Sequence, residues 1–456
     1  MNAKKRKLLL ILPRGDRSYF GKVSSTGKAG FIRLGLPTIA ALTPDDWDVE
    51  IHDCRVSPAN FDQKVDVVGI TGFTNEIPYA YSVADGFRAK GVTVIMGGVH
   101  VSALPDEALQ HADAVVIGEA EAVWEPLLRD YEKGELKERY KAKELPKMGG
   151  WPIPRRDLLD RNMYVSGFNS MQATRGCPFD CDYCAVTAFF GKQFRTRPID
   201  EVLAEIEKFD TKHFFFLDDN ITGQPAYAKE LFKRLKPMKR TWGSQTSIVM
   251  AKDKEMLDLY AGCGGKYAFI GFESLSKETL KNVNKSWNSP DSFPVAIQKI
   301  HDAGINIIAS FVFGLDGDDP SVFESTFEFV MKNNIAAAQY HILTPLPGTV
   351  LYNQFKKDER ITDTDWAKYH TGEVVFKPKG MTPDELLEGF HWIYHKTYSI
   401  KNIAKRCLRN TTGLPFRIAA NVSYRKKAKR MPPVGPEYRG MTSADYFEAK
   451  AKGLVK

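Results

Sequence analysis

Short apolar runs alternate with helical patterns along most of this chain, and this alternation limits the folds it can adopt. Two of the runs, Val-Val-Gly-Ile at residues 67–70 and Val-Thr-Val-Ile-Met at 92–96, are almost continuously apolar. Continuous runs are typical of parallel strands that helices cover on both faces, whereas half-exposed strands alternate apolar and polar residues. The sequence therefore predicts an α/β protein built on parallel sheets.

The alternation occurs in two blocks, one over the first 130 residues and one that begins at residue 169. In the first block we expect strands at 8–12, 49–53, 65–70, 92–96 and 114–117, and helices at 78–89 and 120–131. In the second block we expect strands at 170–174, 213–218, 241–248, 267–273, 305–313 and 337–343. Six strand–helix units would form a partial barrel, whose active site would lie at the carboxyl ends of its strands.

Composition divides the 456 residues into four parts. Charge, proline and glycine rise around 147–154, which indicates a linker. Thr382-Pro-Asp-Glu385 has the pattern of a capped helix start. The prediction is a Rossmann-like (flavodoxin-like) sheet over 1–135, a linker over 136–165, a partial (β/α)6 TIM-type barrel over 166–378 and a helical, basic C-terminal segment over 379–456.

Three of the six cysteines, Cys177, Cys181 and Cys184, lie in one short loop with C-x3-C-x2-C spacing. The others are isolated, so the chain lacks a disulfide framework and a reducing cytoplasm is the expected compartment. Three thiolates leave one iron of a cubic iron–sulfur cluster without a protein ligand. A zinc site would need a fourth ligand, but the next candidates, His213 and Cys263, are too far along the chain.

The C-x3-C-x2-C spacing, with Tyr183 just before the last cysteine, resembles the signature of the radical S-adenosylmethionine (SAM) enzymes. The resemblance implies a [4Fe–4S] cluster on Cys177, Cys181 and Cys184 that cleaves SAM to a 5′-deoxyadenosyl radical. It also implies SAM contacts at the strand ends; the candidates are Tyr183, Asp218, Asp219, Gln245, Glu273 and Ser274. Asp218 and Asp219 stand where many members have Gly-Gly-Glu. Each polar candidate could instead be a buried, hydrogen-bonded group or a helix cap.

The run from Met96 to Pro105, followed by 113–121, resembles the cobalamin-binding domain that precedes many radical SAM barrels. The resemblance implies cobalamin contacts at the strand ends; the candidates are Asp53, Thr71, Gly72, Gly97, Gly98, His100, Gly118 and Glu119. The Asp-x-His-x-x-Gly motif, whose histidine replaces the lower cobalt ligand in other cobalamin proteins, is absent from the sequence. A vestigial scaffold that binds no cobalamin is the alternative.

Positive charge is concentrated near the C-terminus, where residues 400–436 contain ten Lys or Arg and no Asp or Glu. The segment could contact an anionic membrane or an acidic partner, although a solvated, partly disordered tail is the simpler expectation. No run approaches the roughly twenty apolar residues of a membrane span. No nucleic-acid-binding module is recognisable. His391 and His395 have the spacing of paired metal ligands, but a structural role is favoured.

The combined resemblance implies a cobalamin-dependent radical SAM enzyme, expected to be a methyltransferase that acts on an unactivated carbon. Its substrate would be a small molecule or a lipid-like or tetrapyrrole-like compound, and a flavodoxin or ferredoxin would supply single electrons. A cyclase, oxidase or rearrangement enzyme with the same cofactors is the first alternative. A non-catalytic cofactor-binding or redox-sensing protein is the alternative from another class.

Overall fold

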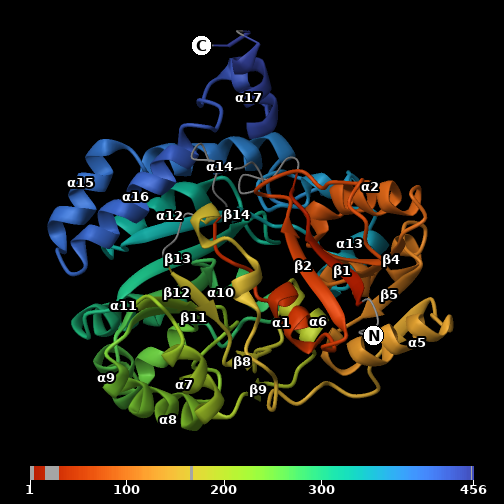
Figure 1. Cartoon of the computed structure of the whole chain (residues 1–456). Coiled ribbons are helices and arrows are strands. Elements are labelled where there is room, and N and C mark those ends of the chain that lie inside the picture. Colours follow the sequence, from red (N-terminus) through yellow and green to blue (C-terminus); the bar gives the residue numbers. More distant parts are fainter. Residues whose placement is uncertain (1–4, 16–29, 165–167, 453, 456) are drawn as a thin grey trace.

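The computed structural model describes residues 5–15, 30–164, 168–452 and 454–455. Two six-stranded sheets, each built of parallel strands, lie side by side (Figure 1). A layer of C-terminal helices packs on the second sheet (Figure 1). This confirms the predicted α/β class, with a Rossmann-like sheet first and a partial barrel after it.

The first sheet has the strand order β2-β1-β3-β4-β5-β6, and all its neighbouring strands are parallel. Its strands are β1 (Arg6–Leu12), β2 (Trp47–Asp53), β3 (Val67–Thr71), β4 (Thr93–Gly97), β5 (Ala114–Ile117) and β6 (Arg139–Lys141). Since the order reverses at β1, ligands are expected beyond the carboxyl ends near this switch. β6 lies in the stretch predicted as linker, because a three-residue polar strand leaves no apolar signal.

Helices cover both faces of this sheet, which explains its continuous apolar strands. Leu9 and Ile11 point to one core, which they share with α2 (Ile77–Arg88). Leu8 and Leu10 point to the other core, formed with α1 (Gly35–Leu42) and α5 (Trp124–Lys133).

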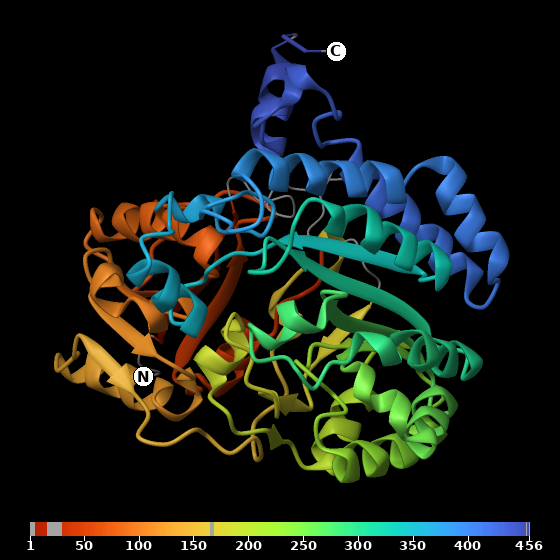
Figure 2. The same cartoon turned by 180° about the vertical axis from the view of Figure 1, so that it is seen from behind.

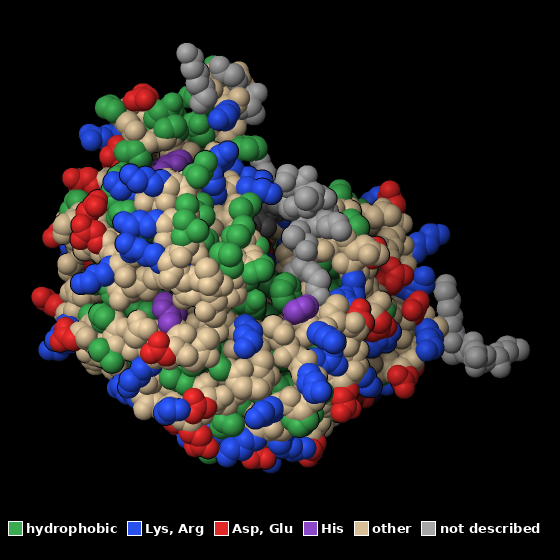
Figure 3. All heavy atoms as spheres, turned by 90° about the vertical axis from the view of Figure 1, so that its left-hand side faces the viewer, with side chains coloured by type: hydrophobic (Ala, Val, Ile, Leu, Met, Phe, Trp, Pro, Cys, Tyr) green, Lys and Arg blue, Asp and Glu red, His purple; other side chains and the backbone are tan. Residues whose placement is uncertain are grey.

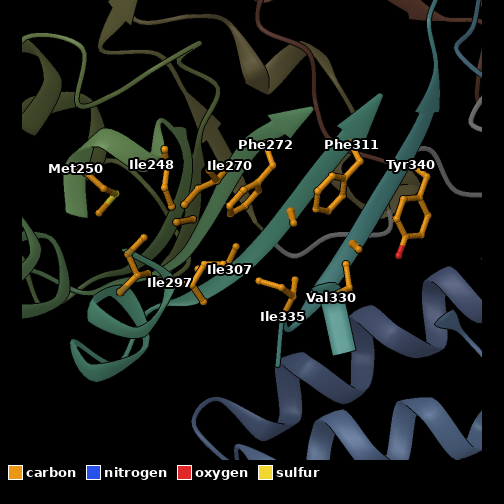
Figure 4. Close-up of a cluster of buried hydrophobic side chains, with 14 of the residues drawn as sticks. Ile248, Met250, Ile270, Phe272, Ile297, Ile307, Phe311, Val330, Ile335 and Tyr340 are labelled. Atoms are coloured by element: carbon orange, nitrogen blue, oxygen red, sulfur yellow. The ribbon is translucent and has the colours of Figure 1, made fainter. Parts of the chain in front are cut away.

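The second sheet is a partial barrel with the strand order β14-β13-β12-β11-β10-β7. Its strands are β7 (Asn169–Met171), β10 (His213–Phe216), β11 (Thr241–Thr246), β12 (Gly265–Glu273), β13 (Asn306–Phe313) and β14 (Ala337–Ile342). The covering helices are α7 (Ile199–Glu207), α8 (Pro225–Leu235), α9 (Lys254–Gly262), α11 (Phe293–Asp302) and α12 (Ser321–Lys332). One face of each strand packs on this helical layer, as the cluster around Phe272 and Phe311 shows (Figure 4).

The first predicted barrel strand is shorter than expected. β7 ends at Met171, and Thr174–Arg175 form β8, which pairs antiparallel with β9 (Arg195–Thr196). The break has a local cause, because the N–H groups of Ala173 and Thr174 donate to the Asp218 carboxylate instead of to a neighbouring strand. The third predicted strand also ends early, at Thr246, before a 3-10 turn over Ile248–Lys252.

The C-terminal segment is helical and well packed (Figure 2). α14 (Pro383–Thr397) begins at the predicted capping box, and α15 (Ile400–Arg409), α16 (Leu414–Ala428) and α17 (Ser443–Ala451) follow. Two helices thus replace the expected disordered basic tail, and two of its arginines, Arg406 and Arg417, are fully buried. No helix in the described ranges combines the length and apolarity needed to cross a bilayer.

Candidate active site

The cysteine loop starts directly after β8 and lies at the carboxyl ends of the barrel strands. Gly176 opens the loop with φ of +83°, and a Cβ atom there would lie 2.5 Å from the Gln193 carbonyl oxygen. Only glycine fits this turn. Cys184 ends the loop, donates its N–H to the Cys181 carbonyl over 3.0 Å and precedes α6 (Ala185–Phe190).

The three cysteines are half-buried and free of disulfides, so their thiols are available as ligands of an iron–sulfur cluster. Burial raises the pKa of Cys181 to about 12 and also raises the pKa values of Cys177 and Cys184. Bound metal ions would compensate for this cost and deprotonate the thiols. Among the described residues no trio of His, Cys, Asp or Glu is gathered tightly enough for a single metal ion. A four-iron cube binds each thiolate to a different iron and does not require that convergence.

Asp218 and Asp219, both predicted SAM contacts, have different environments. Asp218 is fully buried and accepts hydrogen bonds from the Ala173 and Thr174 N–H groups and the Thr174 hydroxyl, so its carboxylate shapes the approach to the cysteine loop. Burial raises the pKa of Asp218 to about 7 and that of Asp219 to about 6. Asp219 is only half-buried and accepts a 3.1 Å bond from the Gly176 N–H. Of the two, Asp219 has a carboxylate that a ligand could contact.

Glu273 and Tyr183, two further candidates, are joined by a residue that the sequence analysis missed. The ammonium of Lys285 lies 2.7 Å from Glu273 Oε1 and 3.2 Å from the Tyr183 hydroxyl. Glu273 sits at an irregularity in the pairing of β12 with β13 and has φ of +64°, a left-handed conformation that is strained for a non-glycine residue. Glu273 and Lys285 are both buried. This ion pair therefore fixes a carboxylate and a cation beside the cysteine loop.

The inner face of the barrel is lined by residues that alternate with those of the helical core. Gln245, Phe215, Phe269, Gln339 and His341 lie on this face and are each partly exposed. Gln245 is thus placed where a ligand could reach it, on a face that also carries Phe215 and Phe269. Ser274 is buried instead, and its hydroxyl accepts from the Ser276 N–H at the start of the next helix.

Glycines line the carboxyl edge of the first sheet, where cobalamin is predicted to bind. A Cβ on Gly98 would lie 2.5 Å from the Thr71 hydroxyl, so the two strand ends approach too closely for any larger residue. Gly118 has φ of +83° and open space where its Cβ would point, and its N–H donates to Ser102, which in turn donates to the Gly98 carbonyl. Gly97 lies at the same edge, whereas Gly72 is buried against Pro13 and Glu76. The strand ends at Gly97, Gly98 and Gly118 therefore carry no side chains that would keep a large ligand away.

This glycine edge adjoins the cysteine loop. α3 (Val99–Ala103), which follows Gly98, packs against α6, which follows Cys184. A Cβ on Gly348 would contact both Ala103 and Ala188, so the two helices and the loop after β14 meet closely. The two sheets therefore present their strand ends to one shared region.

Three other predicted cobalamin contacts have side chains that are buried and bonded within the protein. Asp53 pairs with Arg55 at 2.6 Å and accepts from Tyr164; despite burial, these donors hold the pKa of Asp53 below its ordinary value. His100 is fully buried and hydrogen-bonds to Glu107 at 3.1 Å. Both side chains thus bond to neighbouring residues, and their contact with cobalamin stays a prediction.

Glu119 is the third of these buried candidates, and it joins the two sheets. Its carboxylate forms ion pairs with Arg175, the residue before the cysteine loop, and with Arg195 of β9. Arg175 also pairs with Glu121 at 2.6 Å, and Arg195 donates to the Pro146 carbonyl at 2.8 Å. Sequence reasoning missed this group of ion pairs and Lys285, because the partners lie 12 to 102 residues apart. The polar residues that follow the strands were the only available signal.

Two family models match the chain in the order that the fold suggests. The model described as B12 binding domain matches residues 26–128, and the radical SAM superfamily model matches residues 171–330. The first range covers β2 to β5 of the glycine-edged sheet, and the second covers most of the partial barrel.

Two of the similar proteins are bacteriochlorophyllide methyltransferases. Bacteriochlorophyllide d C-12(1)-methyltransferase of Chlorobaculum tepidum is 33% identical over 88% of this chain and 89% of its own length. Bacteriochlorophyllide d C-8(2)-methyltransferase of the same organism is 31% identical, over 86% and 91%.

Two solved structures share the fold at 14% identity. The radical SAM methyltransferase TsrM from Kitasatospora setae, solved with cobalamin and a [4Fe–4S] cluster, has a TM-score of 0.67 over 93% of this chain and all of its own. The cobalamin-dependent radical enzyme OxsB has a TM-score of 0.68 over 94% of this chain and 72% of its own.

Proposed function

Since this chain belongs to the cobalamin-dependent radical SAM enzymes, we propose that it is a methyltransferase that acts on an unactivated carbon of a tetrapyrrole-like or other apolar small molecule. The family's cofactors are a [4Fe–4S] cluster, SAM and cobalamin. When bound, they supply hydrogen-atom abstraction and a methyl group, chemistry that side chains alone cannot provide.

The chain's own residues would bind and orient these groups. Cys177, Cys181 and Cys184 would hold the cluster, and Tyr183 would lie beside it. Lys285 is the buried cation that suits the carboxylate of SAM, while Asp219 and Glu273 suit its amino group and hydroxyls. Gln245 would contact SAM from the inner face of the barrel.

One observation carries the proposal: the glycine edge of the first sheet adjoins the cysteine loop of the second through α3 and α6. Methyl transfer between cofactors on separate sheets requires that both reach one substrate. The half-buried Phe215 and Phe269 of the inner face favour an apolar substrate, as do the bacteriochlorophyllide methyltransferases among the relatives.

Product analysis tests the proposal. The anaerobically reconstituted protein, loaded with cobalamin, is given SAM, a reductant and a bacteriochlorophyllide. Methyl transfer by this route predicts S-adenosylhomocysteine and 5′-deoxyadenosine in about equal amounts, together with a methylated product. If substrate turns over and only 5′-deoxyadenosine accumulates, methylation is refuted.

A cyclase is the second candidate function, because anaerobic magnesium-protoporphyrin IX monomethyl ester cyclase of Cereibacter sphaeroides is 27% identical over 67% of this chain and 55% of its own length. The same assay separates the two reactions, since ring closure consumes no methyl group. Either reaction needs single electrons, and we propose a flavodoxin or ferredoxin as the donor.

A further inference from the structure

α15 and α16 form a helical hairpin whose exposed residues are basic and apolar. The short link at 410–413 joins the two helices, which pack against each other. Arg406 and Arg417 are buried and hydrogen-bond to the barrel, so their charges do not reach the surface. Six other cations are exposed, namely Lys401, Lys405, Arg409, Lys426, Lys429 and Arg430. We call these residues, with the apolar ones described next, the α15–α16 face.

None of these six cations forms an ion pair with another residue in the described part of the chain. Residues 400–436 contain no Asp or Glu that could balance them. Elsewhere on the surface the charges are commonly paired, as Arg129 is with Asp46 and Glu132. The positive potential of the α15–α16 face is therefore not compensated within its own segment.

Large aliphatic side chains stand among these cations. Leu408 is 79% exposed and Ile400 is 69% exposed, among the highest values for apolar residues of the described chain. On α16, Ile418, Val422 and Lys426 follow at four-residue spacing and so lie on one side of the helix. Figure 3 shows Lys and Arg side chains beside apolar ones over this flank of the molecule.

We propose that the α15–α16 face docks on an anionic lipid membrane. The aliphatic side chains would enter the headgroup boundary while the flanking cations meet the acidic headgroups. An acidic protein would satisfy the cations but not the protruding Leu408 and Ile400. An acidic electron donor seated here would also lie far from the cluster, because α15 and the cysteine loop with α6 are well separated in both views (Figures 1 and 2). The inference does not depend on the reaction proposed above.

Vesicle cosedimentation of the full chain tests this docking. The probes are vesicles of phosphatidylcholine alone and vesicles that also contain phosphatidylserine. We expect binding to the anionic vesicles only, and weaker binding as salt rises. Lys405→Gln with Arg409→Gln should weaken binding about 30-fold, since each charge near an anionic surface contributes about fivefold. Leu408→Ser should weaken it at least about tenfold.

The matched control removes two exposed cations of the barrel, Lys212→Gln with Lys236→Gln, and should leave binding nearly unchanged. Circular dichroism and the melting temperature should stay the same in all variants, because the altered side chains are exposed. Failure to bind anionic vesicles overturns the proposal, as does an equal loss in the control. If the charge variant weakens binding and Leu408→Ser does not, the aliphatic side chains do not enter the membrane, and this outcome overturns the proposed docking mode.

Discussion

Lys285 is the residue on which the proposed SAM site depends. It joins the left-handed Glu273 of β12 to Tyr183 of the cysteine loop, and stacking of Phe179 on Trp287 at 3.6 Å between ring centroids closes the same corner. A left-handed non-glycine residue costs about 1–3 kcal/mol, so the ion pair has to offset strain as well as burial.

Replacing Lys285 by Met should destabilise the protein by about 3–5 kcal/mol, because the Glu273 carboxylate is then buried without a partner. SAM should also bind more weakly, whereas Lys285→Arg should retain part of both properties because it keeps the charge. Urea unfolding measures the first effect, and titration of the reconstituted protein with SAM measures the second. Wild-type SAM affinity in Lys285→Met would contradict the assignment.

The raised pKa of Asp218 should make the stability of the protein depend on pH. Its pKa rises from the ordinary 3.8 to about 7 in the folded protein, because burial opposes the charged form more than its three donors favour it. The folded state then holds a proton that the unfolded state releases, so stability falls between about pH 4 and pH 7 by about 1.4 kcal/mol per pH unit. Asp218→Asn lacks this titration. From pH 4 to pH 7, the unfolding free energy of the wild type should therefore fall relative to that of Asp218→Asn. A difference between the two proteins that does not change with pH would show that Asp218 does not titrate in this range.

At the scale of elements, side chains of α14 and α16 replace a missing seventh strand. β14 is the edge of the barrel sheet, and the Tyr398 hydroxyl bonds both the N–H and the carbonyl of Ala338. Tyr394 does the same for Tyr340, and Asn421 donates to the Ala336 carbonyl. Covering the edge in this way prevents it from pairing with another chain.

Removing the Tyr398 hydroxyl tests this role. Tyr398→Phe leaves two buried backbone groups unpaired and should cost about 1–3 kcal/mol in unfolding free energy. Tyr438→Phe is the matched control, because the Tyr438 hydroxyl makes no hydrogen bond within the described chain. Equal losses in both variants, measured by urea unfolding, would show that the edge bonds contribute nothing specific.

The sequence predicted those elements whose signal is local. The buried strands from Leu8 and Val67 were readable because both faces are apolar, and the cysteine loop because its spacing is short. Strands β6, β8 and β9 could not be predicted, because two or three mostly polar residues are too few to show a periodic pattern. Lys285 and the partners of Glu119 were missed for a related reason: their contacts depend on how distant segments fold together.

For the whole molecule, Glu119 links the two sheets and the connector between them. Its carboxylate forms ion pairs with Arg195 and Arg175. Arg195 donates to the carbonyl of Pro146, in the segment that connects the two sheets, and Arg175 precedes the cysteine loop. All three charged side chains are largely buried, so losing the carboxylate leaves two cations with fewer partners.

Glu119→Ala should therefore loosen the connector and speed tryptic cleavage at Lys143 and Lys147 by about tenfold or more. Asp200→Ala removes an exposed ion pair with Arg234 inside the barrel layer and should leave that rate unchanged. A cleavage rate in Glu119→Ala that matches the wild type would mean that the ion pairs of Glu119 do not hold the two sheets together.

If Cys177, Cys181 and Cys184 carry the cluster that cleaves SAM, their removal should abolish SAM cleavage. Formation of 5′-deoxyadenosine is measured anaerobically with a reductant and cobalamin, in the wild type and in the variant with all three cysteines changed to alanine. We expect steady formation by the wild type and none by the variant. SAM cleavage that survives the triple replacement would show that these cysteines do not carry the cluster.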